Sequence, residues 1–133
     1  MSSKLDVRIY YEDTDHGGIV YHANYLKFME RGRTEYLREL GFEQSHLSKN
    51  EDTVFALSRT DIHYLRPAYF DDLICVHTEM VKVKGARIYF KQKVVRGDVS
   101  LVEGDILVAC MSKLGKPKRV PKLLLDFSQK EKA

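Results

Sequence analysis

One stretch decides the fold of this 133-residue chain: residues 24–40, which read NYLKFMERGRTEYLREL. Its apolar side chains recur at intervals of three and four, the pattern of a helix with one buried face; they are Tyr25, Leu26, Phe28, Met29, Tyr36, Leu37 and Leu40. We predict an N-cap at Asn24 and a helix terminator at Gly41. Gly32 weakens such a helix by about 1 kcal/mol relative to alanine, so we expect a strand to pack closely against it.

The rest of the chain has the alternation of strands. Polar and apolar residues alternate over 53–66, 73–83, 87–96 and 99–114, where Gly104 suggests a β-bulge, and residues 7–11 predict a short first strand. The turns at 84–86 and 96–98 are too short for parallel crossovers, so the neighbouring strands must be antiparallel. We therefore predict an α+β domain with a curved antiparallel sheet around one long central helix, and dimerisation through an edge strand.

Length and composition limit the class of protein. A chain of 133 residues buries about two-thirds of its surface, which supports one domain over residues 1–133. The hydrophobic fraction of 44% excludes a disordered chain, and a net charge of +3 is too small for a dedicated nucleic-acid binder. No uncharged apolar run approaches the roughly 20 residues of a membrane span, and the N-terminus lacks the apolar core of a secretory signal. We expect a cytoplasmic protein.

Two smaller features complete this outline. Cys75 and Cys110 lie in apolar runs, which predicts buried free thiols in a reducing compartment. Residues 115–133 form a basic tail around Pro117 and Pro121, which we expect to be a loosely held, solvated terminus.

The residue types that support chemistry are concentrated at the junction between the first strand and the helix. Residues 10–25 read YYEDTDHGGIVYHANY and contain carboxylates, two histidines, tyrosines and a glycine pair. Backbone N–H groups at a helix start are unpaired, and the helix dipole favours negative charge there, so a developing oxyanion would be stabilised. The glycine pair would allow a ligand to approach closely.

Four interpretations of this segment compete. An EF-hand calcium loop fails because Asn24 stands where a glutamate belongs, and a metal site of Asp13, Asp15, His16 and His22 matches no standard zinc spacing. In a purely structural interpretation the Asp and Thr side chains only cap the turn. In the fourth, acyl transfer to water, an aspartate that is ionised at pH 7 activates water or attacks the acyl group. Spacing alone leaves the last two open.

The same segment resembles a known family. YYEDTDHGGIVYHANYL, followed by FMERGRTEYLR, is similar to the signature of the YbgC-like branch of hotdog-fold acyl-CoA thioesterases, within the 4-hydroxybenzoyl-CoA thioesterase family. The similarity continues through YLRPAYFDD at residues 64–72 and the strand around 107–111, so it covers nearly the whole chain except the tail. The resemblance implies a hotdog fold and hydrolysis of acyl-CoA to a free acid and CoA, without a metal or redox cofactor.

The resemblance also implies roles for particular residues. It identifies Asp15 as the catalytic carboxylate, acting as general base or nucleophile, with His22 and Tyr11 in the active site. The main-chain N–H of His22 would be the partner of the thioester carbonyl oxygen. Gly18 and Tyr21 are further candidates for substrate binding.

For CoA phosphates the candidates are Lys84 and Arg87 at a strand turn, or the basic tail, although ordinary solvated charges are the simpler interpretation. Sites in this family lie between subunits of dimers, which are usually paired into tetramers. We therefore expect a homo-oligomer that acts on acyl-CoA, and acyl carrier protein is a further candidate partner.

Two rival functions remain at this stage. A hotdog hydratase or dehydratase would pair His22 with Glu30 or Glu35, although ordinary helix-surface ion pairs explain both glutamates. A non-catalytic module would bind acyl carrier protein or a membrane-associated partner. The sequence leaves the length and type of the acyl group open.

Overall fold

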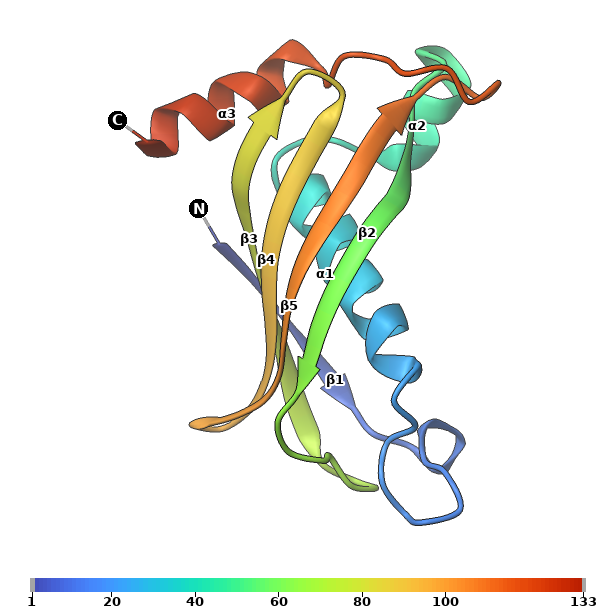
Figure 1. Ribbon diagram of the computed structural model, residues 1–133, viewed down its shortest axis with the longest axis vertical. Coiled ribbons are helices and arrows are strands. Elements are labelled where there is room, and N and C mark those ends of the chain that lie inside the picture. The colour runs from blue at the N-terminus through green and yellow to red at the C-terminus, as the bar shows by residue number, and fades with distance from the viewer. Residues whose placement is uncertain (1, 133) are drawn as a thin grey trace.

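The computed structural model describes residues 2–132, with side chains to residue 128, so both ends of the predicted 1–133 domain lie outside it. It contains one five-stranded antiparallel sheet in the order β1-β3-β4-β5-β2. The strands are β1 (Ser2–Arg8), β2 (Val54–Tyr64), β3 (Leu73–Lys84), β4 (Arg87–Arg96) and β5 (Val99–Met111). The long helix α1 (Asn24–Glu39) lies against one face of the curved sheet (Figure 1). The predicted α+β architecture is therefore confirmed.

Helix α1 ends as predicted but begins differently. Gly41 has φ of 95°, and the N–H groups of Gly41 and Phe42 donate to the carbonyls of Arg38 and Leu37, which is a Schellman motif. At the other end the N-cap is Ala23, so the prediction of Asn24 as N-cap is wrong. Asn24 is the first helical residue, because its side-chain amide donates instead to the Asp13 carbonyl at 2.9 Å.

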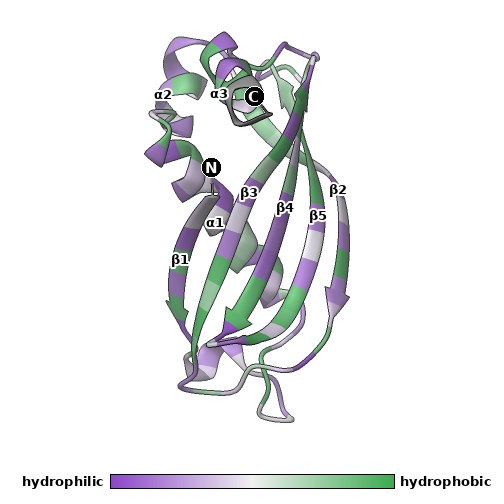
Figure 2. Ribbon diagram, turned by 90° about the vertical axis from the view of Figure 1, so that its left-hand side faces the viewer, coloured by the Kyte–Doolittle hydropathy of each residue, from purple (hydrophilic) through white to green (hydrophobic). Residues whose placement is uncertain are grey.

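The core lies between α1 and the sheet. One face of β3 and one face of β4 are buried, and hydrophobic and hydrophilic bands alternate along these strands (Figure 2). The buried residues of the two strands alternate along the chain, as the predicted strand pattern requires: Ile74, Val76, Thr78, Met80, Ile88, Phe90, Gln92 and Val94. A Cβ added at Gly32 would lie 2.8 Å from both Val76 Cγ1 and Thr78 Oγ1, so the expected close packing of a strand against this glycine is confirmed.

Two details of the strands differ from prediction. Strand β1 ends at Arg8, and not at Tyr11, because the Asp13 carboxylate accepts the Tyr10 N–H at 2.8 Å and turns the chain into the short 3₁₀ helix η1 (Tyr11–Asp13). Gly104 lies in regular register opposite Ile62, so the predicted bulge there is wrong. Helix α1 packs closely against Gly104, since an added Cβ would lie 2.8 Å from Met29 Cε, the flexible end of that side chain.

The C-terminal segment is not a loose tail. After the short helix α2 (Gln44–Asn50) and the sheet, the chain ends in helix α3 (Lys122–Lys132). Val120 and Leu124 are buried against the core, and the Val120 N–H donates to the Gly85 carbonyl at 2.9 Å. The expectation of a solvated terminus is therefore wrong up to residue 128, because buried apolar side chains hold the segment in place. None of the helices within residues 2–132 is long and apolar enough to cross a bilayer.

Candidate functional site

The loop between β1 and α1 lies at one end of the sheet, beside the connection from β2 to β3 (Figure 1). Backbone hydrogen bonds fix it to that connection at both ends. The Ile9 N–H donates to the Asp72 carbonyl and the Val20 N–H to the Ala68 carbonyl, each at 2.9 Å. The segment with the predicted chemistry is therefore held in a defined conformation.

Asp15 lies at the exposed tip of this loop. Its Oδ1 accepts the Gly17 N–H at 2.8 Å, and its carbonyl accepts the Gly18 N–H at 3.0 Å. Gly18 has φ of 81°, a left-handed conformation that strongly favours glycine. Since Oδ2 has no hydrogen-bond partner among the described residues, the carboxylate is fixed through one oxygen and accessible through the other.

His22 lies in the turn that leads into α1. The Tyr64 hydroxyl donates to its carbonyl oxygen at 3.1 Å, and its ring packs against the Tyr21 ring with centroids 4.5 Å apart. The Tyr21 carbonyl accepts the Asn24 N–H at 2.9 Å, and in a trans peptide the following N–H points the opposite way. The His22 N–H therefore points away from the helix, and it has no acceptor within residues 2–132.

The other predicted loop residues lie on the same surface. The Tyr11 ring is 75% exposed and stacks on Phe70, with centroids 3.9 Å apart and planes 8° from parallel. Gly18 and Tyr21 belong to the same exposed loop. Tyr11, Asp15, Gly18, Tyr21 and His22 thus all belong to the one segment between β1 and α1.

Sequence reasoning missed the residues that support the loop. Tyr64 and Phe70 contact His22 and Tyr11, and both belong to the segment 64–72 that carried part of the family resemblance. Asp72 accepts the Tyr69 N–H at 2.9 Å and also pairs with Arg96 at 2.8 Å. The sequence therefore contained a signal for Tyr64 and Phe70, because both lie in the family motif at residues 64–72. No role had been assigned to the side chains of that motif.

Tyr25, a buried residue of α1, contacts the connection between β2 and β3. The Ala68 N–H donates to the Tyr25 hydroxyl oxygen at 3.2 Å. Burial raises the pKa of the Tyr25 phenol, and the Ala68 N–H partly offsets that effect. Tyr25 therefore remains a neutral structural group beneath the loop at physiological pH.

Lys84 and Arg87 lie far from this loop in the same chain. Leu73, at the start of β3, pairs with Arg8 beside the loop, whereas Lys84 ends β3 and pairs with Arg87. Eleven steps along a strand at about 3.3 Å per residue separate the two ends of β3 by roughly 36 Å. A single chain therefore does not bring these two cations to Asp15 (Figure 1).

Two alternative sites considered from the sequence were a metal site and a hydratase pair of His22 with a glutamate, and the described residues form neither. No group of three or more His, Cys, Asp or Glu side chains suited to a metal ion occurs in the described part of the chain, which includes the loop. Glu30 accepts the Thr34 hydroxyl at 3.0 Å, and Glu35 pairs with Arg38 at 3.2 Å, as expected for helix-surface charges. Neither glutamate is therefore paired with His22, as a hydratase would require.

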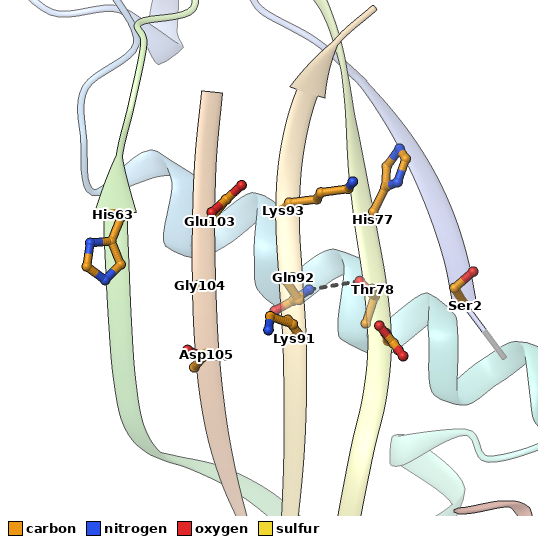
Figure 3. A pocket seen from close by; sticks show the side chains of 11 residues that line it. Ser2, His63, His77, Thr78, Lys91, Gln92, Lys93, Glu103, Gly104 and Asp105 are labelled. Carbon is orange, nitrogen blue, oxygen red and sulfur yellow. Dashed lines mark hydrogen bonds between the residues drawn. The ribbon is translucent and has the colours of Figure 1, made fainter. Parts of the chain in front are cut away.

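A separate depression lies on the sheet face turned away from α1 (Figure 3). It measures about 650 Å³ and is lined by charged side chains of several strands. Opposite charges face each other across the strands, with Lys93 opposite Glu103 and Lys91 opposite Asp105. Because its charges are balanced and it contains none of the loop residues, this depression is distinct from the candidate site.

Comparisons with known proteins agree with this geometry. The family model described as Thioesterase superfamily matches residues 17–103. An acyl-CoA thioesterase YbgC of Haemophilus influenzae is 49% identical over 86% of this chain and 83% of its own length. An acyl-CoA thioester hydrolase YbgC of Escherichia coli O6:H1 is 40% identical over 92% of this chain and 93% of its own length. A probable thioesterase from Bartonella henselae superposes with a TM-score of 0.88 at 35% identity, over 91% of this chain and 100% of that one.

Proposed function

The chain belongs to the thioesterase superfamily and hydrolyses acyl-CoA thioesters to a free acid and CoA, and we propose that Asp15 provides the carboxylate for this reaction. The fold is accordingly the hotdog fold, and the groups that we assign to the reaction lie in the loop between β1 and α1. One observation carries the proposal: in the loop that leads into α1, Asp15 is held by a single carboxylate oxygen, and the His22 N–H has no acceptor among the described residues.

The two groups have complementary tasks. When water attacks a thioester, negative charge develops on the carbonyl oxygen, and an N–H donor aimed at that oxygen lowers the barrier. The His22 N–H suits this task because it is unpaired and lies at the positive end of the α1 dipole. Asp15 Oδ2 either takes a proton from the attacking water as the C–S bond breaks and CoA leaves, or attacks the carbonyl carbon itself. In the second case CoA leaves as its thiolate, and water then hydrolyses the mixed anhydride to the free acid and the Asp15 carboxylate.

The contact between Asp15 and Gly17 has a direct chemical consequence. Because Oδ1 is held by the Gly17 N–H, the carboxylate cannot rotate freely, and Oδ2 keeps one direction. Preorganisation of this kind lowers the cost of reaching the reactive geometry. Tyr11 and Tyr21 are exposed residues of the same loop, and we assign them to substrate contact.

We propose that the working form is a homodimer, alone or paired into a tetramer, joined through the edge strand β2. The exposed residues of β1 are polar, namely Ser2, Lys4, Asp6 and Arg8, and charged edges resist pairing. Beside β2, by contrast, Leu57, Tyr64 and Leu65 are each about half exposed. Apolar surface next to an unpaired strand favours burial by a second copy.

Three further assignments accompany this proposal. We expect no requirement for a metal or redox cofactor, so activity should survive a chelator. Acyl carrier protein is a candidate carrier, which release of free acid from an acylated carrier would test. We place the enzyme in the cytoplasm, and the free thiols of Cys75 and Cys110 support a reducing compartment.

The decisive test is Asp15→Asn. A positioned base contributes about 10²- to 10⁴-fold, so turnover with acyl-CoA should fall by at least that factor while the fold is retained. Asp98→Asn, in the exposed turn between β4 and β5, is the matched control and should keep full activity. Near wild-type turnover of a folded Asp15→Asn enzyme would refute the assignment. A single turnover in ¹⁸O-labelled water separates the two mechanisms, because label enters the Asp15 carboxylate only through the anhydride.

A further inference from the structure

The positive charge of the chain is concentrated in one short stretch. Residues 113–123, which read KLGKPKRVPKL and which we call the basic segment, contain five basic residues and no acidic one. Since the whole chain has a net charge of +3, the remaining residues together carry −2, that is 3 minus 5. Clusters of about four to eight lysines and arginines are a sequence signal for anionic lipid headgroups.

The fold holds the basic segment in one conformation. The segment begins in a turn after β5, which the Gly115 N–H closes by donating to the Ser112 carbonyl at 2.9 Å. It then crosses the end of the sheet to reach α3 (Figure 1), and on the way the Val120 N–H donates to the Gly85 carbonyl at 2.9 Å. The cations of the segment therefore lie on a defined surface of the folded domain.

Four of the five cations are available to a ligand. The exception is Lys118, whose Nζ donates to the carbonyl oxygens of Glu51 and Asp52 beyond the end of α2. The other four are exposed and form no ion pair with a carboxylate of residues 2–128; they are Lys113, Lys116, Arg119 and Lys122. Even when the charges of Glu51 and Asp52 are counted, this surface keeps an excess of three positive charges, that is 5 minus 2.

Two leucines of the basic segment are exposed among these cations. Leu114, in the turn after β5, is 89% exposed, and Leu123, in the first turn of α3, is 66% exposed. The next residue, Leu124, is fully buried, so α3 is held to the core by one side and presents Leu123 on another. Apolar side chains beside cations favour a lipid surface, where they enter the boundary between headgroups and acyl chains. The phosphate backbone of a nucleic acid, by contrast, attracts only the charges.

We propose that the basic segment is a docking surface for membranes that contain anionic lipids. Its four available cations pair with the lipid phosphates, and its two exposed leucines enter the headgroup region. In a dimer paired through β2 the two strands run antiparallel, so the two basic segments lie at opposite ends and one membrane engages one of them. Binding is therefore peripheral and reversible, which agrees with a cytoplasmic enzyme.

The first test measures co-sedimentation of the full chain with lipid vesicles. Vesicles of equal parts phosphatidylglycerol and phosphatidylcholine should bind the protein, vesicles of phosphatidylcholine alone should not, and binding should weaken as ionic strength rises. Lys113→Gln/Lys116→Gln should lower the partition coefficient at least tenfold, since one cation near such a surface contributes about fivefold. Lys91→Gln/Lys93→Gln removes the same charge from the outer face of the sheet and is the matched control.

The outcomes of this test are decisive. If the wild-type protein does not bind the anionic vesicles, the proposal is overturned. An equal loss of binding in the two double variants also overturns it, because the net charge of the protein alone would then explain the binding.

The two leucines distinguish a membrane from other polyanions. Leu114→Ala/Leu123→Ala keeps every charge, and it should weaken binding to the anionic vesicles several-fold because less apolar surface enters the lipid. Any binding to duplex DNA, measured in the same buffer, should be the same as for the wild type. If this variant binds the vesicles as well as the wild type does, the surface recognises negative charge in general, and the membrane proposal is wrong.

A fluorescent reporter measures insertion directly. The chain contains no tryptophan, so Leu114→Trp introduces a single indole at the proposed contact. Its emission should shift to shorter wavelength on addition of anionic vesicles, and brominated lipids should quench it. Val81→Trp, at an apolar position of β3 that is 46% exposed, is the control and should show neither effect. Equal responses at the two positions would overturn the proposal. None of these measurements requires hydrolysis, so they succeed or fail independently of the proposed function.

Discussion

The Tyr64 hydroxyl donates a hydrogen bond of 3.1 Å to the carbonyl oxygen of His22, and so joins the end of β2 to the turn that begins α1. This contact orients the backbone whose N–H we assign to the thioester carbonyl. It also couples the catalytic loop to the strand through which we expect the dimer to form.

Tyr64→Phe should therefore reduce turnover more than stability. Loss of one exposed hydrogen bond costs about 0.5–1.5 kcal/mol, while a loosened His22 turn should lower kcat several-fold. Steady-state kinetics and urea unfolding measure the two effects. Tyr69→Phe removes a hydroxyl from the same connection and serves as the control. If the two variants have the same kcat, the Tyr64 contact has no role in positioning His22.

The pair between Asp72 and Arg96 should contribute to the stability of the site. Arg96 Nη1 lies 2.8 Å from Asp72 Oδ2, which also accepts the Tyr69 N–H, and both side chains are mostly shielded from solvent. We expect Asp72→Ala to lower the free energy of unfolding by about 1–2 kcal/mol. A double-mutant cycle with Arg96→Ala should give a coupling energy of at least about 0.5 kcal/mol. If the losses in unfolding free energy of the two single variants simply add in the double variant, the pair contributes no coupling energy and this prediction is contradicted.

Gly32→Ala should destabilise the protein although alanine is the better helix former. Alanine gains about 1 kcal/mol in helix propensity over glycine, but its Cβ would lie 2.8 Å from Val76 Cγ1 and Thr78 Oγ1. Overpacking of a core costs typically 1–3 kcal/mol, so we expect a lower midpoint of thermal unfolding. Glu39→Ala, on the exposed side of α1, is the control for propensity alone. A raised midpoint in Gly32→Ala would show that the sheet can yield at this point.

Acid should destabilise the fold partly through His77. Its partial burial, and then the charges of Lys4 and Lys93, lower its pKa. The unfolded chain therefore binds a proton at His77 more readily than the folded protein does, so stability falls as pH decreases through the ordinary histidine pKa of about 6.5. His77→Gln should flatten the decline in unfolding midpoint between pH 7 and 5.

The sequence predicted most of the fold because its signals are local. The spacing of apolar residues in 24–40 and the alternation in β3 and β4 each determine which side chains are buried. Gly41 was identifiable because a left-handed residue must end such a helix. The predictions for Asn24 and Gly104 failed for one shared reason. Each residue is explained by a contact with a distant part of the chain, Asp13 for one and Met29 for the other.

The segment after Gly115 shows the same limit. Its lysines and prolines are typical of a solvated terminus, but burial of Val120 and Leu124 outweighs that composition. Whether an apolar residue finds a surface to cover depends on the whole fold, so composition alone could not reveal α3.

For the site, the sequence by itself determined which residues we propose for the chemistry: Asp15, His22 and Tyr11 lie within twelve residues of one another, and a recognisable motif identifies them. Only the tertiary structure decided which distant residues support the loop, namely Tyr64 and Phe70, and that Lys84 and Arg87 lie at the opposite end of the sheet. The physical reason is that hydrogen bonding within a loop follows from neighbouring residues, whereas the distance between two strand ends follows from strand length and pairing, which no local pattern of residues encodes.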